Sequence, residues 1–345
     1  MGLPSNNGEL FVATSTELIR PIRTSETGIW RQCKLKWYLT FILGFQGNKI
    51  NTAFWLGTLV HFVLSEWYLG RTTDPAHLFT IISTELIAYE RNEGISVEGV
   101  DLDFNNVQEL EESQKLGVAM LEGFQGWAEK NFSDFDVIDS ELSFYLPMET
   151  LDGDDFTYVI RLDLLTENSE GIRVVDFKTA KDFRAEKTVE MDQQFRRYPW
   201  MVMRALPPKE AKKVQGSEWV ALRKMIPSAR SKPPYFKRQP IDLGPTEWKG
   251  VEQEIIAEAT DIIRTEKWLA DGVDPRSVIY PSPTFDCSWK CEYFSNGLCF
   301  SWRAGLDVSD PELIVGQGTM GNDPYSEYKA DWANAVPVSI GRLET

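Results

Sequence analysis

Three short apolar runs in the middle of the chain set the strongest limit on its fold. The segments 137–147 (VIDSELSFYLP), 156–165 (FTYVIRLDLL) and 172–178 (IRVVDFK) are typical of β-strands in their alternation and in their β-branched and aromatic residues. The sequences METLDGDD and TENSEG between them carry Gly, Asp and Asn residues that favour tight turns. We therefore predict an antiparallel meander at the centre of the chain.

Helical patterns flank these strands on both sides. Upstream, we predict a helix from residue 25 that carries Cys33, a helix over 53–70 that is apolar nearly all round, and further helices within 76–132. Downstream, we predict a helix at 187–206, a strand at 217–226, a loop rich in Pro and Lys at 227–240, and an amphipathic helix at 245–272. The expected fold is α/β: a mixed central sheet that contains the meander, flanked by helices, with a helical N-terminal subdomain.

The charge of the chain is unevenly distributed. The net charge is −16, which argues against a nucleic-acid partner. However, residues 178–238 hold 16 Lys and Arg against 6 Asp and Glu, a local balance of +10. This basic island is either a solvated surface or a tract that binds phosphates, and charge alone does not decide between them.

The apolar stretches of the chain are too short or too interrupted to cross a bilayer. The N-terminus, MGLPSNNGEL, lacks the basic and apolar regions of a signal peptide. We expect a cytoplasmic protein with no membrane partner.

The run VVDFKTAK (174–181) places two charged side chains on one face of a strand. Asp176 and Lys178 are two residues apart and point the same way, and pairing of neighbouring strands would bring Asp163 to the same side of the sheet. Two such carboxylates suit a hard cation such as Mg²⁺, and the lysine suits phosphate charge. Taken alone, a D-x-K pair is more often a solvated strand end, and His61 on its apolar helix is more often a core residue.

The order of several motifs resembles the PD-(D/E)XK nucleases of the RecB type. These are GTLVHFVLSEW on a helix, then Asp163, then the D-x-K of residues 176–178, then QFRRY. The resemblance implies that His61, Asp163 and Asp176 are metal ligands for Mg²⁺ or Mn²⁺ and that Lys178 is the catalytic lysine. It implies, further, a restriction-endonuclease-like core.

The same resemblance assigns roles around this centre. Gln194 and Tyr198, which lie four residues apart on one helix face, would contact DNA or brace the site, together with Arg196 and Arg197. Glu141 matches a recurrent acidic residue on the first strand.

Four cysteines form a second constellation: Cys33 lies upstream, and Cys287, Cys291 and Cys299 lie downstream. In a cytosolic protein this spacing indicates a metal or cluster site rather than disulfides. The arrangement resembles the AddB-type and CRISPR-associated exonucleases and implies a [4Fe–4S] cluster. A structural Zn²⁺ site or four unligated thiols are the alternatives.

The resemblance covers residues 25–303 as one nuclease domain, with a helical insertion at about 70–135 and a closing segment at 281–303. Residues 1–24 are expected to be flexible, and 304–345 form an acidic tail. The chain departs from the family pattern at Ile160, where Gly is common, at Lys34, where Pro is usual, and at Pro199, which is expected to disturb the helix of Gln194.

The expected function is that of a metal-dependent DNA exonuclease acting on single strands or DNA ends in recombination, repair or replication. The alternatives are a DNA-end-binding module without catalysis and a structure-specific endonuclease of the same chemistry. The chain shows no G-x-x-x-x-G-K-[ST] motif, so any helicase is expected to be a separate partner. A recombinase or an annealing protein is the other expected partner.

Overall fold

The computed structural model describes residues 18–45, 52–93 and 104–308, and the chain divides into two compact units. The sheet unit comprises Met1–Thr24 and Ile50–Thr260, and the cysteine unit comprises Ser25–Lys49 and Asp261–Thr345. Each unit thus combines segments that are distant in the sequence. The predicted nuclease domain over 25–303, with its insertion and closing segment, stays a prediction.

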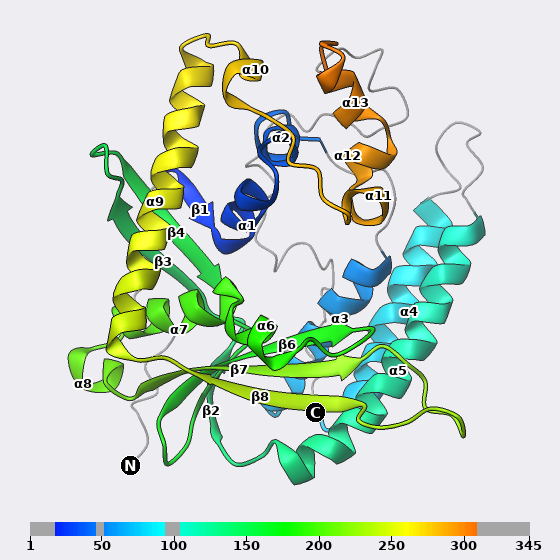
Figure 1. Cartoon of the computed structure of the whole chain (residues 1–345). Coiled ribbons are helices and arrows are strands. Elements are labelled where there is room, and N and C mark those ends of the chain that lie inside the picture. The colour runs from blue at the N-terminus through cyan, green and yellow to red at the C-terminus, as the bar shows by residue number, and fades with distance from the viewer. Residues whose placement is uncertain (1–17, 46–51, 94–103, 309–345) are drawn as a thin grey trace. The chain divides into compact units, whose positions relative to one another are not determined.

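A five-stranded mixed sheet forms the centre of the sheet unit, in the order β2-β5-β6-β7-β8. Its strands are β2 (Asp136–Ser140), β5 (Leu164–Glu167), β6 (Ile172–Ala180), β7 (Val214–Arg223) and β8 (Phe236–Asp242). The β6–β7 pair is parallel and the other three pairs are antiparallel. With helices on its flanks (Figure 1), this mixed sheet confirms the predicted fold class.

A second sheet of three strands has the order β1-β4-β3. It consists of β1 (Pro21–Arg23), β4 (Asp155–Arg161) and β3 (Ser143–Glu149), with β1 parallel to β4. The predicted flexible segment 1–24 therefore ends in a strand, while its residues 1–17 lie outside the described residues.

Two predicted strands each break into two at the passage between these sheets. The run 137–147 forms β2 and β3, and the run 156–165 forms β4 and β5. At the break, Glu141 has a left-handed φ of 53°, and its backbone N–H donates to the carbonyl of Asp163 over 3.1 Å. The prediction of two unbroken strands was wrong because alternation of side chains continues through a bend and does not reveal it.

Helices α3 (Thr52–Tyr68), α4 (Pro75–Glu93) and α5 (Phe104–Asn131) confirm the predicted upstream helices of the sheet unit. They lie together at one side of the five-stranded sheet (Figure 1). Phe177 of β6 stacks on Tyr68 and meets the edges of Phe124 and Phe132. This aromatic cluster explains why α3 is apolar nearly all round, because its residues face both the sheet and the other helices.

The opposite face of the sheet is covered by α7 (Gln193–Ala205), which follows the short α6 (Glu186–Glu190). The predicted helix at 187–206 is therefore interrupted before Asp192, whose side chain caps α7 by accepting from the backbone N–H of Gln194 over 3.0 Å. Pro199 lies inside α7 and cannot donate to the carbonyl of Phe195 four residues earlier. The buried hydroxyl of Ser217 on β7 donates to that carbonyl instead, over 2.8 Å.

After α8 (Pro208–Ala211), the remaining downstream elements follow the expected order. Strand β7 lies three residues before the predicted span, and α9 (Pro245–Ala270) confirms the predicted amphipathic helix. The predicted loop at 227–240 was wrong for its last residues, which belong to β8 and pair with β7.

The cysteine unit is a set of short helices around an aromatic core. Its helices are α1 (Thr24–Gln32), α2 (Lys34–Trp37), the π-helix η1 (Tyr38–Ile42), α10 (Pro275–Val278), α11 (Cys287–Lys290), α12 (Glu292–Ser295) and α13 (Leu298–Arg303). Trp30 and Trp37 meet edge to face at 4.8 Å, and the Trp37 indole donates to Glu26 over 3.0 Å. The predicted continuous helix through Cys33 was wrong: Cys33 is extended, with φ −163° and ψ 114°, between α1 and α2.

Within the parts of the chain that the structure describes, no helix is long and apolar enough to cross a membrane. Most of the predicted acidic tail, from residue 309 on, lies outside the described residues.

Candidate active site and cysteine-lined cavity

Asp163 lies in the bend between β4 and β5, where the register of two strands places it beside β6. Leu164 pairs with Val175, so Asp163 falls opposite Asp176. Asp163 Oδ2 accepts the backbone N–H of Phe177 over 2.8 Å and lies 3.2 Å from Nδ1 of His61 on α3. The bend thus turns this carboxylate out of the sheet and toward the helix.

Asp176 and Lys178 form the second half of the site, on the face of β6 that α7 covers. The Lys178 ammonium donates to Asp176 Oδ1 over 2.9 Å, and the Gln194 side-chain amide donates to the same oxygen over 2.6 Å. Asp176 Oδ2 lies 2.7 Å from the ammonium, but outside hydrogen-bond geometry, and has no hydrogen-bond partner among the described residues. One oxygen of a carboxylate that is 2% exposed therefore keeps its acceptor capacity.

Burial and the neighbouring charges shift the pKa values of the two carboxylates in opposite directions. The pKa of Asp176 is raised to about 6: burial is the main cause, the neighbouring Asp163 adds to it, and Lys178 offsets only part of the rise. Burial also opposes ionisation of Asp163, but His61 and Lys178 outweigh it and lower its pKa. Burial opposes protonation of His61, yet the charge and hydrogen bond of Asp163 raise its pKa overall.

A divalent metal ion fits this donor set. Two carboxylates and an imidazole are ligands that Mg²⁺ and Mn²⁺ accept, and Oδ2 of Asp176, although ion-paired with Lys178, is a buried acceptor without a hydrogen-bond partner among the described residues. The structure joins His61 to Asp163, and Asp176 to Lys178 and Gln194. Within the described ranges, it does not yet group three His, Cys, Asp or Glu side chains closely enough to hold a metal ion.

Glu141, at the left-handed bend, also belongs to the surroundings of Asp163. Its carboxylate pairs with Arg161 at 2.6 Å. Burial raises the pKa of Glu141, and Arg161 opposes that shift while Asp163 adds to it. Sequence reasoning gave no role to Arg161, and no local pattern in the sequence singles it out.

Tyr198 lies one turn after Gln194 on α7 and faces the same carboxylates. Burial raises the pKa of its phenol well above the usual value, the charges of Asp176 and Asp163 add to this, and a hydrogen bond with Gln194 opposes it. Pro199 therefore does not move Gln194 or Tyr198 away from the site. Sequence reasoning missed Asp192, which begins α7; an Asp just before QQFRRY is itself a capping signal.

The two arginines of QFRRY are held by acidic residues of α9. Arg197 is 0% exposed and pairs with Glu258 at 2.8 Å, while Arg196 pairs with Glu254 at 3.4 Å. A direct contact between Arg197 and DNA is thus incompatible with its burial, and only the bracing role remains for it.

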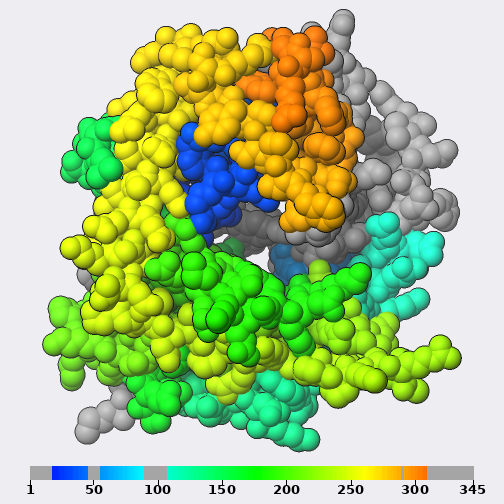
Figure 2. All heavy atoms as spheres, viewed as in Figure 1, coloured from blue at the N-terminus to red at the C-terminus, as the bar shows by residue number. Residues whose placement is uncertain are grey.

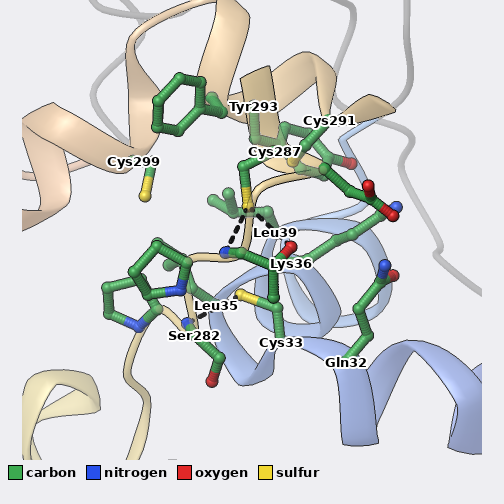
Figure 3. A pocket seen from close by; sticks show the side chains of 15 residues that line it. Gln32, Cys33, Leu35, Lys36, Leu39, Ser282, Cys287, Cys291, Tyr293 and Cys299 are labelled. Atoms are coloured by element: carbon green, nitrogen blue, oxygen red, sulfur yellow. Dashed lines mark hydrogen bonds between the residues drawn. The ribbon is translucent and has the colours of Figure 1, made fainter. Parts of the chain in front are cut away.

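All four cysteines line one cavity of about 340 Å³ in the cysteine unit (Figure 3). Cys33 Sγ accepts the backbone N–H of Ser282 over 3.4 Å, and Cys287 Sγ accepts that of Thr284 over 3.2 Å. Burial raises the pKa of Cys299, and the other three thiols raise it further. The four thiols are free and, among the described residues, are not drawn together as ligands of a single ion.

The cavity brings together four side chains that can act as thiolate ligands. The cysteines come from two distant segments of the sequence and line the same cavity. Backbone N–H groups donate to the sulfur atoms of two of them, Cys33 and Cys287. Four thiolates with N–H···S hydrogen bonds are the donor set of an iron–sulfur cluster.

Comparison with known proteins identifies a family through the sequence of the chain. No curated protein matches the chain. One solved structure, described as the crystal structure of SSO0001, is 12% identical and aligns over 50% of this chain and 85% of that chain, with a TM-score of 0.26. Residues 27–295 match the sequence profile of the PD-(D/E)XK nuclease superfamily. The match spans most of the chain and coincides with a mixed sheet of the restriction-endonuclease-like type, so the chain belongs to the PD-(D/E)XK nuclease superfamily.

Proposed function

We propose that this chain is a metal-dependent DNA exonuclease that hydrolyses phosphodiester bonds of single strands or DNA ends. Membership of the superfamily supports hydrolysis of phosphodiesters with DNA as the substrate. The observation that carries the proposal is the buried Asp176, which has a raised pKa and lies beside Lys178 and across from Asp163.

His61, Asp163 and Asp176 are the residues that would hold Mg²⁺ or Mn²⁺. The bound ion would supply Lewis-acid chemistry at the phosphate and lower the pKa of water. Lys178, which is ion-paired with Asp176, would stabilise the negative charge that develops on the phosphate. Gln194 holds Asp176 Oδ1, so that the other oxygen stays available, and Tyr198 keeps Gln194 in place.

The decisive assay uses end-labelled linear DNA and circular single-stranded DNA with Mg²⁺, Mn²⁺ or EDTA. An exonuclease degrades the linear substrate with metal and spares the circle. Degradation of the circle would favour the structure-specific endonuclease, and DNA binding without any cleavage would favour the end-binding module. Asp163→Ala and Lys178→Ala should each abolish metal-dependent nucleotide release while the thermal unfolding profile remains cooperative; activity in both variants would refute the assignment.

We also propose that Cys33, Cys287, Cys291 and Cys299 hold a [4Fe–4S] cluster, as in the RecB and AddB type of nuclease. Protein purified without oxygen should contain four irons and four sulfides per chain and show the visible absorption of such a cluster. Cys33→Ser should lose the iron. Stoichiometric zinc in a colourless protein would replace the cluster with a structural Zn²⁺ site.

Recombination, repair and replication are the processes in which we place such an activity. A separate helicase, a recombinase or an annealing protein is the partner that we propose. Copurification of one of these with the tagged full chain would test the proposal.

A further inference from the structure

Ion pairs within the chain occupy much of the predicted basic island. Besides the pairs of Arg196 and Arg197, they include Arg184–Asp192, Lys213–Glu167, Arg223–Asp182, Lys237–Glu186 and Arg238 with Glu218 and Asp134. These cations already have counter-charges, so a phosphate would have to displace a carboxylate. The positive charge that is available to a phosphate therefore lies on those Lys and Arg residues of the island that have no ion pair with a described residue.

Three of the remaining cations lie in one segment, residues 224–235, which connects β7 to β8 and which we call the basic arm. It carries Lys224, Arg230 and Lys232 and no acidic residue. Arg230 and Lys232 are exposed and Lys224 is half-buried, and none of the three forms an ion pair with any residue that the structure describes. In Figure 2 the arm is the yellow-green projection at the right of the view.

Hydrogen bonds within the arm hold it in shape. The Ser231 hydroxyl accepts the backbone N–H of Ser228 over 2.7 Å, and the Tyr235 hydroxyl donates to the Ser231 carbonyl over 3.2 Å. At the base, the Arg223 guanidinium donates to the Lys232 carbonyl over 3.4 Å. These hydrogen bonds order the loop that carries the positive charges. Binding of a ligand therefore costs less conformational entropy than binding to a flexible loop would.

Phe236, the aromatic residue next to the arm, does not serve as a stacking platform. Phe236 packs against Phe124 and Trp127 at 5.6 and 5.7 Å, within the core between the sheet and α5. Tyr235 is engaged with Ser231. We therefore expect recognition by the arm to rest mainly on charge.

The arm begins close to the candidate active site. The backbone N–H of Lys224 donates to the carbonyl of Ala180 over 2.7 Å, and Ala180 is two residues beyond Lys178 on β6. Because a strand rises about 3.3 Å per residue, this start lies roughly 7 Å along β6 from Lys178. The start of the arm is thus near enough to Lys178 for the neighbouring phosphates of one strand to reach both.

We propose that the basic arm binds the phosphates of single-stranded DNA on one side of the bond that is cleaved, through Lys224, Arg230 and Lys232. This inference rests on the proposed function for the identity of the strand. Lys224 supports it from a second direction: burial without a carboxylate lowers the pKa of its ammonium, and a phosphate would supply the missing counter-charge.

The test measures binding of a fluorescein-labelled oligothymidylate by anisotropy, in EDTA, over a series of salt concentrations. The test variant combines Lys224→Gln, Arg230→Gln and Lys232→Gln. Each phosphate contact on a single strand contributes about 0.7 to the slope of log K against log salt, so the slope should fall by about 2. At 0.1 M salt the affinity should fall by about 100-fold. The pair Arg230→Gln and Lys232→Gln, both exposed, should lower the slope by about 1.4 and serves if the triple variant does not fold.

The matched control replaces three exposed lysines outside the arm, Lys187, Lys209 and Lys212, by Gln. It removes the same charge and should leave the slope unchanged. Equal slopes for the arm variants and the control would refute the proposal that the basic arm binds the phosphates of DNA. Because binding in EDTA is independent of cleavage, a chain that binds through the arm but cleaves no DNA with metal refutes the proposed nuclease activity and leaves the arm standing.

Discussion

Replacement of Asp176 by Asn tests the electrostatic reasoning at the candidate site. The carboxyl has its pKa raised from 3.8 to about 6, because burial opposes its charge and Asp163 repels it while Lys178 offsets only part. One pKa unit corresponds to about 1.4 kcal/mol, so its ionisation costs about 3 kcal/mol more in the folded than in the unfolded chain. The asparagine amide has nearly the shape of the protonated carboxyl and carries no charge. Asp176→Asn should therefore stabilise the metal-free protein while it abolishes cleavage.

The sign of the pH dependence follows from the raised pKa. The folded state binds this proton more tightly than the unfolded state, so this group destabilises the fold as pH rises from about 4 to about 6, and the loss is complete above that range. At about pH 4 the two chains should unfold at nearly the same temperature. Near neutral pH the variant should unfold roughly 4–6 °C higher than the parent chain.

Thermal unfolding in EDTA, followed by circular dichroism at both pH values, measures the effect. Asp182→Asn is the control, because that carboxylate is 73% exposed and should change stability by less than about 0.5 kcal/mol. Equal unfolding temperatures for the Asp176→Asn chain and its parent at neutral pH would refute the conclusion that ionisation of the buried Asp176 destabilises the metal-free fold.

Three further predictions concern packing and metal binding. Ser217→Ala should cost about 1–3 kcal/mol, because it leaves a buried carbonyl without a donor; in a Pro199→Ala background, where the helix regains its own N–H, urea titration should show a smaller loss. Gly117→Ala should cost about 1–3 kcal/mol, because its Cβ would lie 2.3 Å from the buried ring of Phe79, whereas Gly126→Ala has open space and should stabilise the same helix by up to about 1 kcal/mol in thermal unfolding. Adding Mn²⁺ at 100 times its dissociation constant should stabilise the parent chain by about 2.7 kcal/mol near neutral pH and less below about pH 6, where protons compete for the carboxylates; a stabilisation by Mn²⁺ that does not change with pH would contradict this ligand set.

Periodicity predicted the elements whose environment is uniform along their length. Helices α3 and α9 have apolar residues at helical spacing, and both formed within two residues of the expected bounds. The sequence did not reveal that the runs 137–147 and 156–165 each divide into two strands that belong to different sheets. The bend at Glu141 needs a left-handed residue, and a glutamate gives no signal for that conformation.

Some contacts of the candidate site follow from local strand pairing and were predictable from the sequence, whereas others depend on how distant elements pack. A short turn joins β5 to β6, so the closeness of Asp163 and Asp176 follows from local pairing. The contact of Gln194 with Asp176 depends on how α7 lies on the sheet, and only the resemblance to a family pointed to it. Counting charges also failed for Arg197, because composition carries no information on which cations are buried.

The cysteine unit imposes an order on synthesis of the chain. Cys33 leaves the ribosome 254 residues before Cys287, a delay of roughly 13–50 s at ordinary elongation rates. The hydrogen bonds of Tyr293 with Thr40 and with the carbonyl of Phe45 cannot form before that time. The five strands of the central sheet are all translated in the interval. A ligand of all four thiols can therefore bind only after the sheet has had time to fold. A chain that terminates before Cys287 would contain Asp163 and Asp176 but would lack three of the four cysteines that line the cavity.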